Sequence, residues 1–336
     1  MTGFSPLKGA GPAGPEISVI IPTFNRRPVL LSVLAGFADQ LEAGLERGEP
    51  CFEVIVVDDG STDDTREAVT AARGSFPYPL RLLPAEHGGP GKARNLGIMV
   101  ASAPILLFVD SDLIPGRRLV AAHLAAHRQH PRAVVHGPVI QVRTLDVQVA
   151  RRQRARLSDL SRAFFAGGNV SIRKEYLLRA GLFDEELSRW GWWEDLELGE
   201  RLRALPAGPG ERLRVVRTPG AAGYHYKPPL TADRLPCLCE REAARAKSAL
   251  VFYRKHPTLA VRRKIPLSRV AFALDRLLAA GGWPEKPWAD RWIARAEKSG
   301  RGWLFRILAW VKLQHAYFGT LRREWRAYRR QLNRGS

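Results

Sequence analysis

The feature that most constrains the fold is a repeated order of strand, polar loop and helix in the first third of the chain. Three apolar runs stop abruptly at polar residues: 16–22 before Thr23-Phe24-Asn25-Arg26, 52–57 before Asp58-Asp59, and 103–109 before Asp110-Ser111-Asp112. Apolar residues at helical spacing predict helices over 28–47, from Asp63 and over 92–100. Strands that alternate with helices and are apolar throughout indicate a parallel sheet covered on both faces, the α/β class.

The acidic pair Asp110 and Asp112 is poorly explained by packing, because buried strands avoid uncompensated charge. Two convergent carboxylates suit a hard divalent cation that also holds phosphate oxygens, although both could instead cap a turn. In such sheets ligands bind beyond the carboxyl ends of the strands. We therefore expect Asn25, Asp58 and Asp59 to converge with this pair on one edge of the sheet.

Two further patterns near this edge have structural alternatives. Asp58 and Asp59 could accept an N–H from a nucleobase or could belong to a helix-capping turn. The loop 88–91 is glycine-rich but matches neither the dinucleotide fingerprint nor the P-loop spacing. Lys92 and Arg94 after it place cations where a diphosphate would lie, or they begin a solvated helix.

The second dense signal is the segment 190–197, Trp-Gly-Trp-Trp-Glu-Asp-Leu-Glu. Aromatic faces pack against sugar rings, and a carboxylate beside an apolar wall can act as a general base. The alternative is an aromatic core cluster followed by acids in the first turn of a helix, where the helix dipole favours them. Strands are expected over 133–142, 167–173 and 213–217 and a helix from Glu194, which predicts an α+β half.

The basic charge belongs to the last third of the chain. Residues 231–336 contain 24 Lys and Arg against 8 Asp and Glu, a net charge of +16 of the total +20, interleaved with aromatic residues. This pattern suits helices that lie on an anionic membrane surface, grip an anionic acceptor, or cap the fold with a solvated basic face. No run is long and apolar enough to span a membrane, residues 1–15 resemble a disordered leader, and three cysteines favour a reducing cytoplasm.

Taken together, the motifs ISVIIPTFNR, VIVVDDGSTDDT, GKARNLG, FVDSD, GGNVSIRK and WGWWEDLELG resemble the family 2 nucleotide-sugar glycosyltransferases of the GT-A fold. The resemblance covers about residues 16–230. It implies a single, mostly parallel Rossmann-like sheet in a nucleotide-sugar half (16–132), an acceptor-binding half (133–230) and, beyond the resemblance, a basic aromatic helical extension (231–336).

The resemblance also implies roles at matching positions. Asp59 would face the base, Asp110 the ribose or a metal water, and Asp112 would bind Mn²⁺ or Mg²⁺, with His225 as a further ligand or a structural hydrogen-bonder. Asp195 would be the base that deprotonates the acceptor, and Glu194 would bind a sugar, unless the two roles are exchanged. The other positions expected to contact the nucleotide are Pro22, Thr23, Asn25, Arg26, Asp58, Lys92, Arg94 and Ser111, and those expected to contact the sugars are Gly168, Asn169, Trp192 and Trp193.

The expected activity is the metal-dependent, inverting transfer of a sugar from a nucleoside diphosphate, most simply UDP, to a hydroxyl of a glycan or lipid-linked acceptor. We expect a cytoplasmic protein, associated with the inner face of the cell membrane if the basic extension contacts lipid. A nucleotidyltransferase would share the metal and the nucleotide but would not need the tryptophan-rich acidic motif. A nucleic-acid-binding protein would use the basic extension but would not gather acids at strand ends.

Overall fold

The computed structural model describes residues 14–40, 52–208 and 210–333. These residues form two compact units. The first comprises 14–40, 52–87, Ala93–Leu182 and 201–226 without residue 209, and the second comprises Gly88–Lys92, Phe183–Glu200 and 227–333. The second unit therefore takes in two segments that precede the basic extension. The expected leader lies outside the described residues up to residue 13, as do Cys51 and residues 41–47 of the first expected helix.

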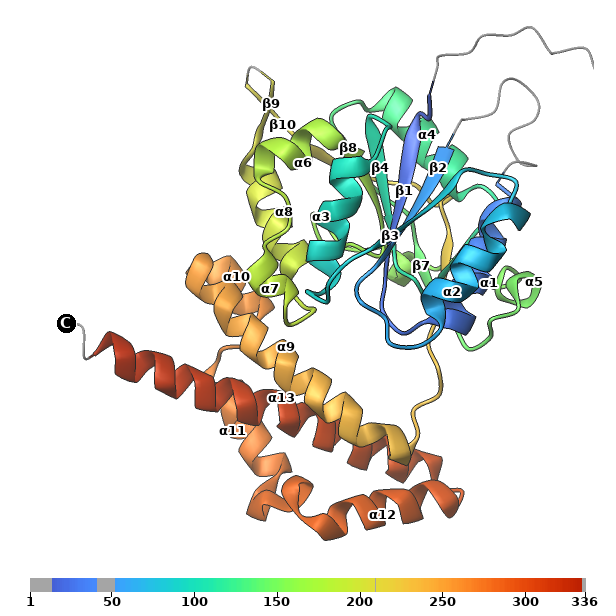
Figure 1. The fold of residues 1–336 in the computed structure, drawn as a ribbon. Coiled ribbons are helices and arrows are strands. Elements are labelled where there is room, and N and C mark those ends of the chain that lie inside the picture. The colour runs from blue at the N-terminus through green and yellow to red at the C-terminus, as the bar shows by residue number, and fades with distance from the viewer. Residues whose placement is uncertain (1–13, 41–51, 209, 334–336) are drawn as a thin grey trace, which may run out of the picture. The chain divides into compact units, whose positions relative to one another are not determined.

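A seven-stranded mixed sheet forms the centre of the first unit. Its strand order is β11-β6-β8-β4-β1-β2-β3, and Figure 1 shows β4, β1, β2 and β3 side by side. All neighbours are parallel except β8, which runs antiparallel to β4 and β6. The strands of the unit are β1 Ile17–Thr23, β2 Phe52–Asp58, β3 Leu80–Pro84, β4 Ile105–Val109, β5 Leu113–Pro115, β6 Ala133–His136, β7 Val139–Val142, β8 Asn169–Arg173, β9 Pro206–Gly208, β10 Glu211–Arg212, β11 Arg214–Arg217 and β12 Gly223–Tyr226.

Helices alternate with these strands, and the sheet is mostly parallel, as predicted. Every residue of β1, β2 and β4 is buried, because helices and loops cover both faces of the sheet. The helices are α1 Arg27–Ala38, α2 Thr65–Ala72, α3 Pro90–Val100, α4 Leu119–Gln129, α5 Val147–Ala150 and α6 Lys174–Ala180, with 3-10 helices over Arg73–Ser75 and Leu157–Asp159.

The strand predicted over 133–142 is in fact two strands. Gly137 and Pro138 divide it, and a Cβ on Gly137 would lie 2.0 Å from the carbonyl oxygen of Ala221, so the chain bends where only glycine fits. After the bend, β7 joins a second sheet of order β5-β12-β7, in which β12 is antiparallel to β5 and parallel to β7. The prediction of a single sheet was wrong on this point.

The second unit is helical. Its two long helices, α9 and α13, pack against each other through buried Ala249, Phe252, Tyr317 and Leu321 (Figure 1). The elements of this unit are α7 Glu185–Ser188, α8 Glu194–Ala204, whose last residues belong to the first unit, α9 Leu235–Lys255, α10 Leu259–Lys264, α11 Arg269–Leu278, α12 Pro287–Lys298, α13 Gly302–Leu332, and 3-10 helices over Ala232–Arg234 and Ala280–Glu285. Among the described residues, none of the helices is long and apolar enough to cross a membrane.

Candidate active site

The carboxyl ends of β1 and β2 meet because the strands are parallel and Thr23 is in register with Asp58. Asp58 is fully buried; its carboxylate accepts hydrogen bonds from the Ser61 amide (3.0 Å) and from Arg66 Nε (3.0 Å). Its oxygens therefore hold the loop after β2, and the nucleotide contact expected of Asp58 stays a prediction. Asn25, at a positive φ of 51°, accepts from the amide of Thr62 (2.8 Å) and joins the two loops.

Asp59 lies beside two aromatic rings. His87 Nδ1 is 2.9 Å from the Asp59 carboxylate, and the His87 ring stacks on Phe24 with centroids 4.3 Å apart. Phe24 is 39% exposed, so one aromatic face is open to solvent at this strand end. Close by in the sequence, the Thr23 hydroxyl is buried without a hydrogen-bond partner among the described residues.

At the end of β4, the buried Arg94 supports the Asp110 carboxylate, which is 37% exposed. The Arg94 guanidinium donates to Asp110 Oδ1 at 3.0 Å and is only 6% exposed. A Cβ on Gly167 would lie 2.9 Å from the guanidinium carbon, and one on Gly168 would lie 2.8 Å from Asp110 Oδ2, so both glycines allow close packing. Arg94 thus positions the Asp110 carboxylate, and the nucleotide contact expected of Arg94 stays a prediction.

The second sheet brings Asp112 and His225 together although 113 positions separate them in the chain. The antiparallel pairing of β5 with β12 sets His225 opposite Leu113, and the Tyr226 amide donates to the Asp112 carbonyl at 2.7 Å. As a result, His225 Nε2 lies 3.2 Å from Asp112 Oδ1, and both side chains remain partly exposed. Arg26 Nη2 is 3.8 Å from the other carboxylate oxygen.

The proton on His225 is fixed by Gln141 on the neighbouring strand β7. Gln141 Oε1 lies 3.1 Å from His225 Nδ1, and this oxygen can only accept, so Nδ1 carries the proton. Nε2 then either donates a second proton to Asp112 or offers its lone pair to a cation. Burial alone would raise the pKa of Asp112, but the hydrogen bond with His225 and the charges of His225 and Arg26 outweigh it and lower that pKa.

This donor set fits a hard divalent cation that is shared with a ligand. Two cis ligands of an octahedral ion with bonds of about 2.1 Å are about 3.0 Å apart, close to the observed 3.2 Å. Within the described part of the chain, no three His, Cys, Asp or Glu side chains converge into a complete site. The remaining ligands would have to be phosphate oxygens and water, which is the usual arrangement for Mg²⁺.

Asn169 is built into the fold. Its amide donates to the carbonyls of Pro138 (3.1 Å) and Ala221 (2.8 Å), and its oxygen lies 3.0 Å from His123 Nε2. It is 2% exposed and its amide joins three segments of the first unit, and the sugar contacts expected of Gly168 and Asn169 stay predictions.

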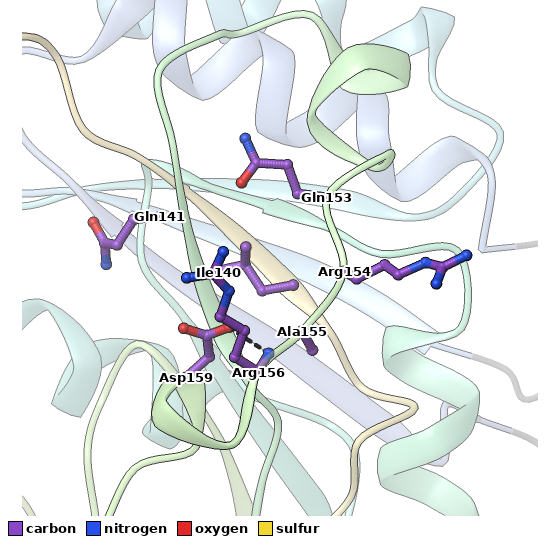
Figure 2. A pocket seen from close by; sticks show the side chains of 7 residues that line it. All are labelled: Ile140, Gln141, Gln153, Arg154, Ala155, Arg156 and Asp159. Carbon is purple, nitrogen blue, oxygen red and sulfur yellow. Dashed lines mark hydrogen bonds between the residues drawn. The ribbon is translucent and has the colours of Figure 1, made fainter.

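A pocket of about 480 Å³ borders Gln141 (Figure 2). The loop after α5 forms its other wall, and the Asp159 carboxylate accepts from the Arg156 amide at 2.7 Å. Gln141 thus has one contact with His225 and one side toward this pocket. The pocket is lined by Ile140, Gln141, Gln153, Arg154, Ala155, Arg156 and Asp159.

In the second unit, the two adjacent acids of α8 differ in burial. Glu194 is 4% exposed and lies under Gly91, where a Cβ would be 3.1 Å from its Cγ. Asp195 is half-buried, and its Oδ1 accepts from the amide of Leu196. Asp195 is therefore the more accessible of the two carboxylates.

The tryptophans before these acids pack against α9. Trp193 adopts a left-handed φ of 72°, donates its indole N–H to the Arg245 carbonyl (3.0 Å) and stacks on Phe252. The Trp192 ring faces the guanidinium of Arg245 at 5.8 Å, and its carbonyl accepts from Ser248 Oγ at 2.6 Å. Both tryptophans thus contact α9, and the sugar contacts expected of Trp192 and Trp193 stay predictions.

The glycine-rich loop is also explained by packing in this unit. Ser188 Oγ donates to the Gly88 carbonyl (3.1 Å) and accepts from the Lys92 amide (2.9 Å). A Cβ on Gly89 would lie 1.9 Å from the Ser188 carbonyl oxygen. The loop is therefore glycine-rich because α7 lies against it, and the nucleotide contact of Lys92 stays a prediction, as do those of Pro22 and Ser111.

Comparison with known proteins identifies the family of this arrangement. Residues 18–181 match the family described as glycosyl transferase family 2. Residues 18–181 form a family 2 glycosyltransferase domain. The match covers the strand ends with Asp58, Asp110 and Asp112 and stops before Asp195 and His225.

The relatives of this glycosyltransferase domain are named for different activities. Validoxylamine A glucosyltransferase of Streptomyces hygroscopicus subsp. limoneus is 35% identical over 295 residues, which are 76% of this chain and 60% of the relative. Hyaluronan synthase of Pasteurella multocida is 26% identical over 63% of this chain and 25% of its own length. The chain thus spans less than two thirds of the length of these relatives.

A solved structure similar in fold confirms the expected GT-A architecture. The mannosyltransferase of Pyrobaculum calidifontis, in complex with GDP-Man and Mn²⁺, has a TM-score of 0.57 at 20% identity and covers 94% of this chain and 90% of its own. At this identity the likeness concerns the fold of the glycosyltransferase domain and the helices that follow it.

Three residues of the glycosyltransferase site were not found from the sequence. His87 and Phe24 supply the rings beside Asp59, and Gln141 orients His225. Phe24 lies inside a quoted motif, but its exposure is a tertiary property. His87 and Gln141 come from a loop and a short strand without any local pattern of their own.

Proposed function

We propose that this chain is an inverting, metal-dependent glycosyltransferase that moves a sugar from a nucleoside diphosphate donor to a hydroxyl of a glycan or lipid-linked acceptor. The observation that carries the proposal is the juxtaposition of Asp112 and His225, with Gln141 holding the imidazole so that Nε2 faces the carboxylate. The family match and the glucosyltransferase relative support sugar transfer over nucleotidyl transfer.

Donor binding is assigned to the strand ends of the first unit. Mn²⁺ or Mg²⁺ held by Asp112 and His225 would neutralise the charge of the leaving diphosphate. Phe24 and His87 offer a stacking face for the base, and Asp59 accepts from it. Asp110, held by Arg94, accepts from the ribose hydroxyls. A UDP-sugar is the first donor to test. Structures of similar fold are complexes with different nucleotide sugars: GDP-Man in the mannosyltransferase and UDP-GlcNAc in TarS 1-349 of S. aureus (TM-score 0.51, 20% identity, covering 94% of this chain and 92% of that one).

Acceptor activation is assigned to Asp195. In a single displacement, the acceptor hydroxyl passes its proton to the Asp195 carboxylate while its oxygen attacks the anomeric carbon, and the bond to the diphosphate breaks on the opposite side. Glu194 is too buried to approach an acceptor and instead supports the loop at Gly91.

Ligand-induced thermal stabilisation tests the donor proposal. UDP, GDP and dTDP are added with Mn²⁺, with Mg²⁺ or with a chelator, and the unfolding temperature is measured. A nucleotide at 100 times its Kd adds about 2.7 kcal/mol to the free energy of unfolding, so binding is visible. We expect the shift with UDP to depend on the metal and Asp112→Asn to lose that dependence.

Asp290→Asn is the matched control, because Asp290 is an exposed carboxylate of α12 that pairs with Lys312. It should leave the nucleotide shift unchanged. No shift with any nucleotide, or an equal metal-dependent shift in Asp112→Asn, would contradict the proposal.

A further inference from the structure

Helix α11 packs on the protein through Asp275 and the partly buried Phe272, and it leaves an apolar stripe exposed. Its buried residue is Asp275, 5% exposed, whose carboxylate lies 2.9 Å from His315 Nδ1 and 3.3 Å from Arg322 Nη1 of α13. Val270, Leu274 and Leu277, one stripe at helical spacing, point away from the protein with exposures of 78%, 51% and 73%. A helix that packed only for its own stability would bury this stripe.

Two other helices of the same unit also carry outward apolar stripes. On α12, Trp288 and Trp292 are 37% and 60% exposed and lie 5.0 Å apart between ring centroids. On the first turns of α13, the exposed large apolar residues are Trp303, Ile307 and Trp310, opposite the buried Phe305 and Ala309.

Exposed tryptophan and leucine on this scale are not explained by the core of the unit. That core is already formed by other residues, including Ile293 on α12 and Phe305 on α13. Contiguous apolar surface on a folded protein marks an interaction site. Tryptophan in particular favours the boundary between hydrocarbon and water, where its ring is buried and its N–H stays solvated.

The charge of these helices indicates which kind of partner they bind. Exposed arginines flank the stripes on each helix: Arg269 and Arg276 on α11, Arg291 and Arg295 on α12, and Arg306 on α13. Residues 269–310 contain 8 Lys and Arg against 4 Asp and Glu, a net charge of +4, so a second copy of the chain would bring like charges together. An anionic lipid surface satisfies the cations and accepts the apolar stripes at the same time.

We propose that α11, α12 and the first turns of α13 form a membrane-docking surface that inserts its apolar stripes into the interface of an anionic bilayer. The helices lie in the plane of the surface, and Asp275 keeps α11 attached to α13 while the opposite face enters the lipid. None of the residues of the docking surface is among those assigned to donor binding.

Vesicle binding by the full chain tests this proposal. Vesicles of phosphatidylcholine alone are compared with vesicles that also contain phosphatidylglycerol, using co-sedimentation and the emission maximum of tryptophan. We expect binding to the anionic vesicles with a blue shift of the emission, weakened by salt. The triple variant Leu274→Ser, Trp292→Ser, Trp303→Ser should bind about tenfold or more weakly.

Leu157→Ser is the matched control, because Leu157 is 89% exposed but belongs to the first unit. Circular dichroism and the UDP-dependent thermal shift of every variant separate loss of docking from loss of fold or of donor binding. Equal vesicle binding by the triple variant would overturn the proposal. A wild-type chain that does not bind the vesicles would also overturn it. The same holds for a wild-type dimer that the triple substitution converts to a monomer.

Discussion

At the scale of single residues, the chemistry of the site depends on where one proton sits. Asp112 Oδ1 and His225 Nε2 are 3.2 Å apart, a distance at which two acceptors repel unless a proton or a cation lies between them. Gln141 places the other imidazole proton on Nδ1 and so reserves Nε2 for that role. The metal site therefore includes a residue that is not itself a ligand.

Substituting this residue should weaken metal binding without removing a ligand. In Gln141→Leu the imidazole loses its acceptor, and the affinity for Mn²⁺ in the presence of UDP should fall about 10- to 100-fold. Calorimetric titration with Mn²⁺ measures it. Gln153→Leu is the control, since Gln153 lines the same pocket but the partner of His225 Nδ1 is Gln141. Equal losses of Mn²⁺ affinity in both variants would mean that Gln141 supports the pocket and not the imidazole.

Substitutions of the two acids of α8 should have different effects on turnover. Asp195→Asn removes the accessible carboxylate, so turnover should fall by about 10²- to 10⁴-fold with little change in melting temperature. Glu194→Gln changes a side chain that is 4% exposed and should act mainly on stability. Initial rates with the donor found by thermal shift, together with melting curves, decide the matter. If Glu194→Gln slowed turnover and Asp195→Asn did not, Glu194 would be the base in place of Asp195.

At the scale of elements, the conformation of the glycine-rich loop depends on the helix that packs against it. The loop Gly88–Lys92 wraps the hydroxyl of Ser188, which both donates to it and accepts from it. Gly89 has a φ of +89° and no room for a Cβ. The glycine is therefore required twice, by its backbone conformation and by the approach of α7.

Gly89→Ala should consequently destabilise the protein by about 1–3 kcal/mol or more, because the left-handed backbone is strained and the Cβ meets the Ser188 carbonyl. Urea unfolding measures the difference. Gly74→Ala is the control, since no atom lies within 4 Å of the added Cβ there and the φ is not left-handed. If Gly89→Ala instead lowers only nucleotide affinity, the loop binds phosphate after all.

At the scale of the whole molecule, stability depends on buried neutral histidines. His123 and His127 of α4 both contact Ser171 Oγ of β8 at 2.8 Å, and His123 also contacts Asn169. Burial lowers the pKa of His123 to about 3 and that of His127 to about 4. The network joins α4 to the central sheet only while both rings are uncharged.

Stability should therefore fall in mild acid. An unfolded histidine has a pKa of about 6.5, so below that pH the unfolded chain binds protons that the folded chain excludes. The free energy of unfolding should decrease by about 1.4 kcal/mol per pH unit for each histidine as the pH drops from about 6.5 toward the folded pKa values. Urea unfolding at a series of pH values measures this slope.

His127→Gln should reduce the slope by the share of one histidine, whereas His130→Gln, at an exposed position after α4, should leave it unchanged. An identical slope in wild type and His127→Gln would show that carboxylates alone cause the acid sensitivity.

The sequence by itself determined the α/β class, the order of most strands and the acids at their ends. It could do so because the apolar period of each segment is local, and because parallel strands necessarily bring their carboxyl ends to one edge. It did not find the division of 133–142, because the bend at Gly137 is imposed by the carbonyl of Ala221, far along the chain.

Only the tertiary structure decided which of the candidate side chains are available for chemistry. Asp58, Arg94, Asn169 and Trp193 are engaged by partners that local sequence does not reveal, while His225 reaches Asp112 only through the pairing of β12 with β5. The periodicity of residues 269–278 likewise predicts an amphipathic helix, but it cannot say which side faces the protein. That choice depends on the ion pairs of Asp275 with α13, because a local pattern does not contain its long-range partners.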